Sequence, residues 1–123
     1  MRQIILDANF IMSCVRNKID FFEGINLMGI QIIIPKQIIS EVEKIAKSRQ
    51  KLHNRETAKL ALKILKKSKF REIDLGRGHA DKKIIKFAGE NPVMIIATLD
   101  KEIQSKIKNQ KMIIRGKKNL EIV

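Results

Sequence analysis

The sequence has a single cysteine, no tryptophan, no tyrosine and no long hydrophobic run. Cys14 alone can form neither an intramolecular disulfide nor a multi-cysteine zinc site. The lack of Trp and Tyr argues against RNA-binding folds that stack bases on aromatic side chains. No stretch approaches the roughly 18 uncharged apolar residues of a membrane span, and Asp7 interrupts the first apolar run too early for a signal peptide. These absences predict a soluble cytoplasmic protein with no membrane partner.

Acidic residues are also scarce, because 13 Asp and Glu stand against 26 Lys and Arg, which gives a net charge of +13. A chain this basic usually binds a polyanion, and nucleic acid is the leading candidate, ahead of an anionic membrane surface. Most of the excess lies between Lys44 and Arg71, where the only acid is Glu56. The alternative explanation of this segment is a solubilising, lysine-rich surface.

Short β-branched runs alternate with longer amphipathic segments along the chain. Continuous apolar runs suit strands buried on both faces of a parallel sheet. The alternation predicts one domain over residues 1–123, a three-layer α/β/α fold with a mostly parallel central sheet of about five strands. The expected strands are 4–6, 32–34, 70–73, 93–96 and 112–114, with an edge strand at 120–123. The expected helices include 36–48, 55–67, 79–89 and 100–109.

Four acidic residues follow successive strands of this predicted sheet. Asp7 comes directly after the first strand, and Asp100 follows the fourth. Asp81 enters the helix after the third strand, and Glu41 lies nearly two turns into the helix after the second. Because ligands of an open parallel sheet bind outside the carboxyl ends of its strands, we expect all four at one rim. Taken singly, each has a simpler explanation as a helix cap or a solvated surface residue.

Carboxylates that converge without a bound cation repel one another and raise each other's pKa. A divalent metal usually resolves this conflict, and Mg²⁺ or Mn²⁺ is the natural choice for a site made of carboxylates and water. Such an ion polarises a phosphodiester and activates water, while the basic surface would hold the phosphate backbone. The residues therefore predict metal-dependent hydrolysis of a nucleic acid.

Four segments of the sequence resemble the motifs of the PIN-domain ribonucleases. The segment ILDAN at 5–9 is similar to the D-x-N motif of that family, and PKQIISEV at 35–42 to its P-x-x-(V/I)-x-x-E-(L/V) segment. The segments ADKKI at 80–84 and ATLDKEI at 97–103 resemble its third-acid motif and its A-T-x-D-x-x-(L/I) motif. All four occur in order over essentially the whole chain. The departures, Ala8 where Thr or Ser is common and Leu99 where Asn often stands, remove no expected ligand.

The resemblance implies a metal-dependent ribonuclease, and more specifically an endoribonuclease, with Mg²⁺ or Mn²⁺ as its cofactor. It assigns the catalytic metal ligands to Asp7, Glu41, Asp81 and Asp100, and the polar groups that support them to Asn9, Thr98 and Glu102.

The connection between the two helices after the second strand carries candidate RNA contacts. Arg49, Lys51 and Arg55 lie where the helix that holds Glu41 should give way to the next. We therefore expect this connection to run close to the rim of the acidic site, where the three side chains could grip RNA phosphates.

Alternative cellular roles stay open at this point. The tail at 112–120 resembles archaeal PIN proteins related to ribosomal RNA processing factors, which implies a role in ribosomal RNA processing. A VapC-like toxin and a non-catalytic RNA-binding PIN-like module are the alternatives, and the presence of all four acids disfavours the latter. RNA is the expected partner, while a homodimer, an antitoxin and a ribosome-assembly partner stay open.

Overall fold

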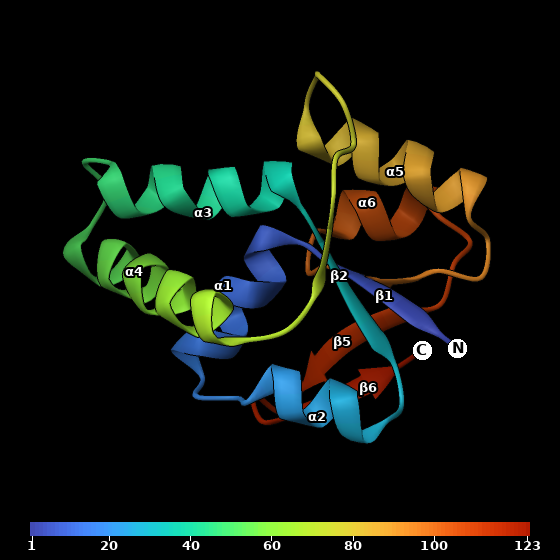
Figure 1. Cartoon of the computed structure of the whole chain (residues 1–123), viewed down its shortest axis with the longest axis horizontal. Coiled ribbons are helices and arrows are strands. Elements are labelled where there is room, and N and C mark those ends of the chain that lie inside the picture. Colours follow the sequence, from blue (N-terminus) through green and yellow to red (C-terminus); the bar gives the residue numbers. More distant parts are fainter.

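A six-stranded sheet forms the centre of the computed structural model, which describes residues 1–123 (Figure 1). Its strand order is β3-β2-β1-β4-β5-β6, in which the first five strands are parallel and β6 is antiparallel to β5. The strands are β1 (Gln3–Leu6), β2 (Gln31–Pro35), β3 (Arg71–Ile73), β4 (Ile95–Ala97), β5 (Lys111–Arg115) and β6 (Asn119–Ile122). The helices are α1 (Ala8–Arg16), α2 (Phe21–Leu27), α3 (Lys36–Lys47), α4 (Leu52–Lys67), α5 (Ala80–Glu90) and α6 (Lys101–Lys106).

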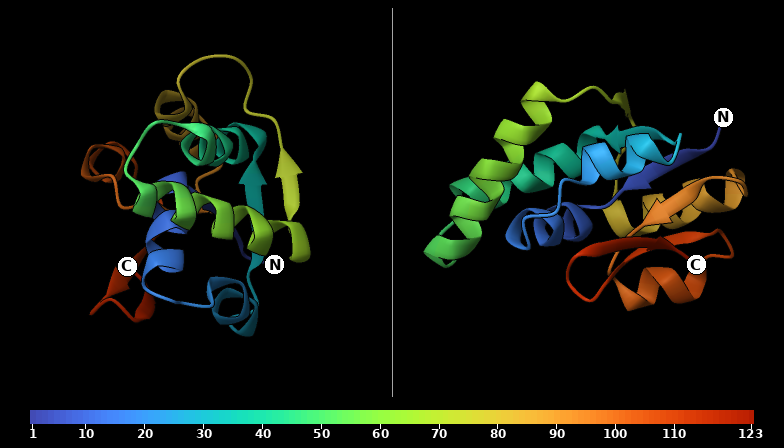
Figure 2. Two further views of the ribbon diagram at one scale, coloured as in Figure 1. Left: turned by 90° about the vertical axis from the view of Figure 1, so that its left-hand side faces the viewer. Right: turned by 90° about the horizontal axis from the view of Figure 1, so that it is seen from below.

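Helices cover both faces of the sheet, as the sequence predicted. Parallel strands in one sheet are joined by right-handed crossovers, so connections that advance in opposite directions cover opposite faces. The chain advances from β1 through β2 to β3, then returns past β1 to β4 and β5. Figure 2 shows α2 and α6 on opposite sides of the sheet, and α5 packs against α6. The predicted three-layer α/β/α fold with a mostly parallel sheet is confirmed.

The two central strands, β1 and β4, are buried almost throughout, and the pairing between them positions the residues that follow each strand. In β1 the residues Ile4, Ile5 and Leu6 have no exposed surface, and in β4 the same holds for all three residues. Leu6 lies opposite Ala97, so the residues that follow, Asp7 and Thr98, leave the sheet side by side. Continuous burial on both faces is the packing expected of a central parallel strand covered by helices.

The boundaries differ from the predicted ones where polar side chains end an element. The helix expected at 100–109 stops at Lys106, because Asn109 turns inward and its side-chain amide donates to the carbonyls of Ala88, Asn91 and Met94 at 2.9–3.1 Å. Apolar periodicity continues to Ile107 and does not reveal this latch. The edge strand expected at 120–123 is present as β6 and forms a hairpin with β5.

The α3–α4 hairpin projects beyond the carboxyl ends of the strands (Figures 1 and 2). The two helices pack along one another, and α4 also packs against α1. The helix predicted at 55–67 begins three residues earlier, at Leu52, so the connection between the helices is only residues 48–51. None of the helices combines the length and hydrophobicity that crossing a membrane requires.

Candidate active site

The chain reverses its direction across the sheet between β1 and β4. From β1 it continues to β2 on one side, whereas from β4 it continues to β5 on the other side. Connections that diverge in this way leave a crevice at the carboxyl ends of the two strands, which is where open α/β sheets bind their ligands. Asp7 directly follows β1, and Asp100 lies three residues beyond β4.

Asp7 is almost fully buried at this switch point, with 3% of its surface exposed. It caps α1, and one carboxylate oxygen accepts a hydrogen bond from the Ala8 amide at 2.8 Å. The other oxygen accepts from the Thr98 hydroxyl at 2.7 Å. Burial nevertheless raises the pKa of the Asp7 carboxyl, and the charges of Asp81 and Asp100 raise it further. Asp7 is therefore a carboxylate held in place at an electrostatic cost.

Thr98 and Asn9 tie the ends of β1 and β4 together. The Thr98 side chain is fully buried, and its hydroxyl oxygen accepts from the Asp100 amide at 3.1 Å while donating to Asp7. The Asn9 side-chain oxygen accepts from the Leu99 amide at 3.0 Å. These bonds tie the segment that carries Asp7 to the segment that carries Asp100. The role that the resemblance implies for Asn9 and Thr98, support of the metal ligands, stays a prediction.

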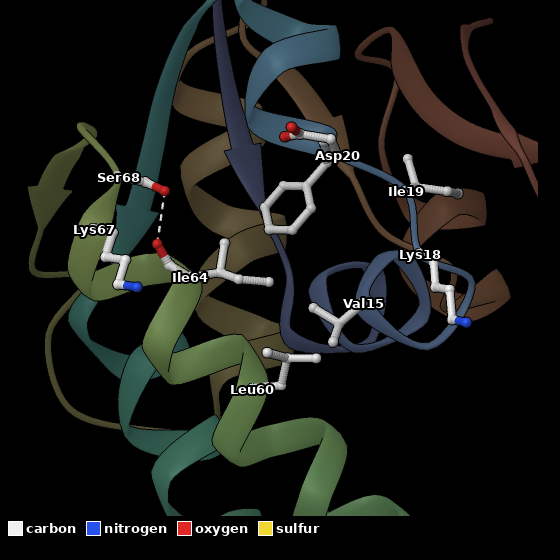
Figure 3. A pocket seen from close by; sticks show the side chains of 9 residues that line it. Val15, Lys18, Ile19, Asp20, Leu60, Ile64, Lys67 and Ser68 are labelled. Carbon is white, nitrogen blue, oxygen red and sulfur yellow. Dashed lines mark hydrogen bonds between the residues drawn. The ribbon is translucent and has the colours of Figure 1, made fainter.

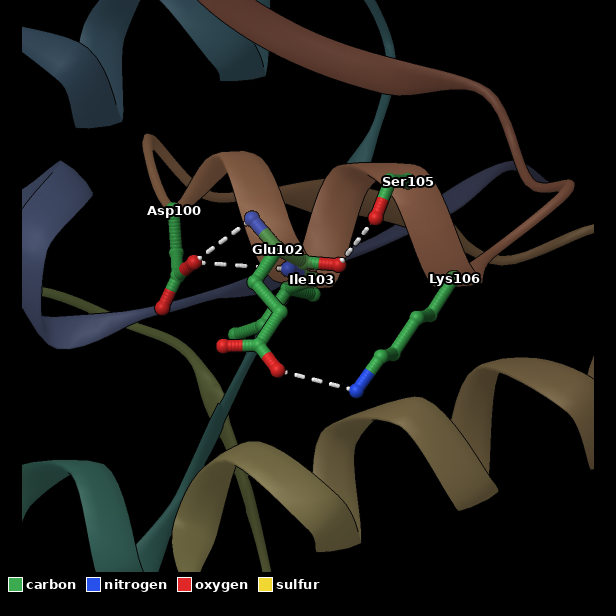
Figure 4. A network of polar contacts seen from close by, with 5 residues as sticks. All are labelled: Asp100, Glu102, Ile103, Ser105 and Lys106. Carbon is green, nitrogen blue, oxygen red and sulfur yellow. Dashed lines mark hydrogen bonds and ion pairs between the residues drawn. The ribbon is translucent and has the colours of Figure 1, made fainter.

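Asp100 caps the short helix α6 (Figure 4). One of its carboxylate oxygens accepts from the amides of Glu102 and Ile103, at 2.9 and 3.3 Å. Its other oxygen makes no hydrogen bond within the protein, which leaves it available to a ligand. Glu102, which the resemblance implies as an assisting acid, is exposed and forms an ion pair with Lys106 at 2.9 Å. Its assisting role stays a prediction.

Glu41 and Asp81 approach the site from the side of β2 and β3. Glu41 lies in the second turn of α3, and Asp81 lies in the first turn of α5. Both residues are partly exposed to solvent. The pKa of the Glu41 carboxyl is raised by burial of that group and by the charges of Asp7 and Asp81, while Lys44 opposes the rise. The charges of these residues therefore act on one another across three elements.

All four predicted carboxylates thus lie at the carboxyl edge of the sheet, within electrostatic reach of at least one other. No three Asp, Glu, His or Cys side chains are drawn together closely enough to form a ready-made metal site. The donor set nevertheless fits a hard divalent cation, because it offers only carboxylate oxygens and a cation would offset their repulsion. His79 is exposed and makes no side-chain cap at α5.

The three predicted RNA contacts lie at the tip of the α3–α4 hairpin. Arg49 and Lys51 are exposed in the connection, and Arg55 is half-buried in the first turn of α4. The Arg55 Nε atom is buried and has no hydrogen-bond partner. Lys47, the last residue of α3, is six residues beyond Glu41, so the helix ends about 9 Å farther along its axis, at 1.5 Å per residue, and Arg49 lies beyond that end.

Gln37 is a residue that the sequence analysis missed. Its amide nitrogen donates to the Asp74 carboxylate at 2.7 Å and to the Gly76 carbonyl at 3.1 Å. Its side-chain oxygen accepts from the Leu75 amide at 3.1 Å. Gln37 thus ties the loop that leads to Asp81 to the helix that carries Glu41. The signal in the sequence is its spacing of four residues from Glu41, which puts both on one side of α3.

We predict that Gln37→Glu lowers RNA cleavage several-fold, because a carboxylate there would face the Asp74 carboxylate and the Gly76 carbonyl without donating to either. Adding Asp74→Asn should restore much of the activity, since the new amide can donate to the introduced carboxylate. The comparison uses steady-state cleavage rates of both variants and of Asp74→Asn alone. A double variant no better than Gln37→Glu would contradict the positioning role.

We also predict that Thr98→Val lowers cleavage by about 10–100-fold, the usual cost of removing a group that orients a metal ligand, which is the role that the resemblance implies for Asp7. The loss of the hydroxyl removes a hydrogen bond that favours the charged form of Asp7, so the pKa of Asp7 should rise further. NMR titration of the Asp7 carboxyl in EDTA measures this shift directly.

The matched control for Thr98→Val is Thr57→Val. Thr57 is also buried, but its hydroxyl donates only to the His53 carbonyl within α4, at 2.9 Å. Thr57→Val should leave both the cleavage rate and the Asp7 pKa unchanged. Equal losses of activity in the two variants would show that Thr98 acts only through stability.

A second hollow lies away from the carboxylates, between α4 and the end of α1 (Figure 3). It has a volume of about 470 Å³, and its floor is apolar, with Val15, Leu60 and Ile64 among the lining residues. Ser68 closes the end of α4 there by donating its hydroxyl to the Ile64 carbonyl at 2.6 Å. None of the four carboxylates lines this hollow.

Fold and site together define the class of protein, an α/β/α domain with an acidic site at the switch point of a mostly parallel sheet. A family model described as a PIN like domain matches residues 4–117. The chain belongs to this family, which confirms the resemblance to PIN-domain ribonucleases seen in the sequence.

Relatives of known class cover nearly the whole chain. This chain is 32% identical to Ribonuclease VapC4 of Methanocaldococcus jannaschii over 128 residues, which cover 99% of this chain and 97% of that protein. The structure of the PIN domain endonuclease Utp24 matches with a TM-score of 0.76 and 25% identity, covering 98% of this chain and 90% of that one. The structure of VapBC2 from Rickettsia felis, bound to a DNA fragment from its promoter, matches with a TM-score of 0.60, covering 89% and 98%. At 16% identity this last likeness shows the fold alone.

Proposed function

We propose that this PIN-domain protein is a divalent-metal-dependent endoribonuclease whose metal ligands are Asp7, Glu41, Asp81 and Asp100. The observation that carries the proposal is the buried Asp7 carboxylate, which is held at the switch point by two hydrogen bonds although other carboxylates act on it. Carboxyl groups whose pKa is shifted by burial and by neighbouring charges are concentrated at functional sites of proteins. The family match and the relative named Ribonuclease VapC4 support RNA as the substrate.

The residues of the chain have distinct tasks in this mechanism. Asp7 and Asp100 are held near one another, because the Thr98 hydroxyl donates to the Asp7 carboxylate and accepts from the backbone amide of Asp100. Glu41 lies on α3, and Asp81 lies in the first turn of α5. These two residues complete the site from the side opposite Asp7 and Asp100. When bound, Mg²⁺ or Mn²⁺ supplies charge neutralisation, polarisation of the phosphodiester and activation of the attacking water. The basic surface offsets the repulsion between the carboxylates and the RNA phosphates.

The test is cleavage of a circular single-stranded RNA by purified protein with Mg²⁺, with Mn²⁺ or with EDTA. A circular substrate has no ends, so only an endonuclease can linearise it. We expect linear product with either cation and none in EDTA. Cleavage that persists in EDTA would contradict metal dependence, and digestion of linear RNA alone would contradict endonucleolytic action.

Two cellular roles fit this activity, and each has a specific observation behind it. The tail at 112–120, which lies within the β5–β6 hairpin, favours ribosomal RNA processing through its resemblance to archaeal PIN proteins of that kind. The 32% identity to Ribonuclease VapC4 favours a VapC-like toxin with an antitoxin partner. Controlled expression in a heterologous cell separates them. A toxin arrests growth in a manner that depends on Asp7, whereas a processing enzyme cuts a precursor ribosomal RNA at a defined position.

A further inference from the structure

A polar groove lies beside Glu41, between α3 and the loop that follows β3. Its volume is about 480 Å³, and Ala80 is its only hydrophobic lining residue. The remaining lining residues are Lys36, Gln37, Ser40, Glu41, Lys44 and Gly78. Glu41, one of the proposed metal ligands, is the only acid among them, so the groove adjoins the proposed metal site at this residue.

The cations of this groove have no ion-pair partner. The ion pairs of the structure join Lys59 with Glu56, Lys106 with Glu102 and Arg115 with Glu121. Lys36 and Lys44 are exposed and form none of these pairs. A third cation, Lys83, lies against the loop, because a Cβ atom added to Gly78 would be 3.0 Å from its Cε atom. Positive charge therefore borders the groove on both sides.

The loop wall of the groove is held in place rather than free. Gln37 forms three hydrogen bonds to it, and the Asp74 carboxylate accepts a further one from the Gly76 amide at 2.8 Å. Gly78 has a φ of +123°, a conformation that residues with a Cβ rarely adopt. A site whose walls are already ordered loses less conformational entropy when a ligand binds.

We propose that this groove binds backbone phosphates of the RNA strand on one side of the bond that is cut, with Lys36 and Lys44 as the contacts. The proposal rests on the proposed ribonuclease function. A polyanion that approaches four carboxylates needs cations next to them, and this groove places unpaired lysines beside Glu41. Lys47 lies one turn beyond Lys44 on the same side of α3, so positive charge continues toward Arg49 at the hairpin tip.

The contacts are lysines, which bind phosphate as point charges and read no base. The groove should therefore contribute affinity without sequence preference. The proposal commits to the RNA backbone as the occupant, because polar side chains and two lysines without an ion pair line the groove, and these groups match a chain of phosphates.

The test compares Lys36→Gln/Lys44→Gln with Lys63→Gln/Lys66→Gln, a control that removes the same charge from the exposed side of α4. Lys→Gln changes helix propensity little, so both variants should fold. Binding of a fluorescein-labelled single-stranded RNA is measured by anisotropy in EDTA over a range of salt concentrations. In EDTA no metal-dependent cleavage competes with binding.

The logarithm of the RNA-binding constant K falls as the logarithm of the salt concentration rises. We expect the groove variant to make this slope shallower by up to about 1.4, at about 0.7 per phosphate contact. This corresponds to about 25-fold weaker binding at 0.1 M salt, with a similar loss for RNAs of different sequence. The control should change the slope little. Because Lys44 also acts on Glu41, Lys36→Gln alone serves as a second variant and should give about half of the slope change.

Equal slopes in the groove and control variants would overturn the proposal. Cleavage by the unsubstituted protein is measured with Mn²⁺ in parallel. Cleavage together with equal slopes would contradict the groove alone, whereas a complete lack of cleavage would contradict the ribonuclease function on which the groove rests.

Discussion

Asp7→Asn should reduce metal-dependent RNA cleavage about a thousandfold, which corresponds to about 4 kcal/mol of transition-state stabilisation. The substitution removes one charge from the centre of the carboxylate site and changes its shape little. Asn is as good a helix cap as Asp, so the bond from the Ala8 amide can be kept. We therefore expect a folded but inactive protein, measured by cleavage rate with Mn²⁺ and by thermal unfolding.

The same variant should be more stable than the unsubstituted protein in EDTA at neutral pH. Burial and neighbouring charges raise the pKa of Asp7 above its ordinary value of 3.8, so the folded state favours the protonated carboxyl. Stability is therefore lost as pH rises from about 3.8 through the raised pKa, and it is recovered as pH falls through that window. Below it Asp7 is neutral in both states, and the difference between the two proteins should disappear.

Asp20→Asn is the matched control. Asp20 caps α2 and accepts from the Glu23 amide at 3.1 Å, but it is exposed and lies outside the carboxylate site. This substitution should leave cleavage unchanged and should not reproduce the pH-dependent gain in stability. Retention of cleavage by rigorously purified Asp7→Asn protein would show that the activity uses other residues or comes from a contaminant.

The sequence predicted the fold and the position of Asp7 and Asp100 at the carboxyl edge of the sheet, because both depend on short-range patterns. Strands such as Ile4–Leu6 are apolar without interruption, and this identifies them as central strands of a covered parallel sheet. Once the strands are ordered, an acid that directly follows one of them must lie at the carboxyl edge. Asp7 and Asp100 could be placed by this argument without coordinates.

What the sequence could not predict depends on contacts between distant segments. The bonds of Gln37 to residues 74–76 join positions 37 to 39 residues apart, and the Asn109 latch spans 15 to 21 residues. Neither follows from periodicity. Glu102 also forms an ion pair with Lys106, one turn away, which the sequence analysis did not consider. The assisting role of Glu102 at the site stays a prediction. The metal ligation itself stays a prediction.

Replacing Arg49, Lys51 and Arg55 together with Gln should weaken RNA binding and flatten its salt dependence. If all three contact phosphates, the slope of log K against log salt becomes shallower by up to about 2.1. This corresponds to about 100-fold weaker binding at 0.1 M salt. The hairpin projects past the carboxyl edge of the sheet, so its tip can meet an RNA strand that leaves the site along α3 (Figure 2). Affinity should fall similarly for all RNA sequences, because phosphate contacts do not read bases.

The structure divides this effect unequally among the three residues. Arg49 and Lys51 are exposed, whereas Arg55 is half-buried and has its Nε atom shielded from solvent. Arg49→Gln/Lys51→Gln should therefore account for most of the slope change. Arg55→Gln alone should change the slope by less than about 0.7, which is the change expected for the loss of one full phosphate contact.

The control for the triple variant removes three charges from farther along α4, at Lys59, Lys63 and Lys66. These side chains are exposed, and Lys59 already lies 3.9 Å from Glu56. If the basic segment is only a solvated, compositionally biased surface, both triple variants should show the same small loss and unchanged slopes. A larger loss of affinity and a flatter salt dependence in the hairpin-tip variant alone would instead show that positive charge at the tip holds RNA beyond the end of α3.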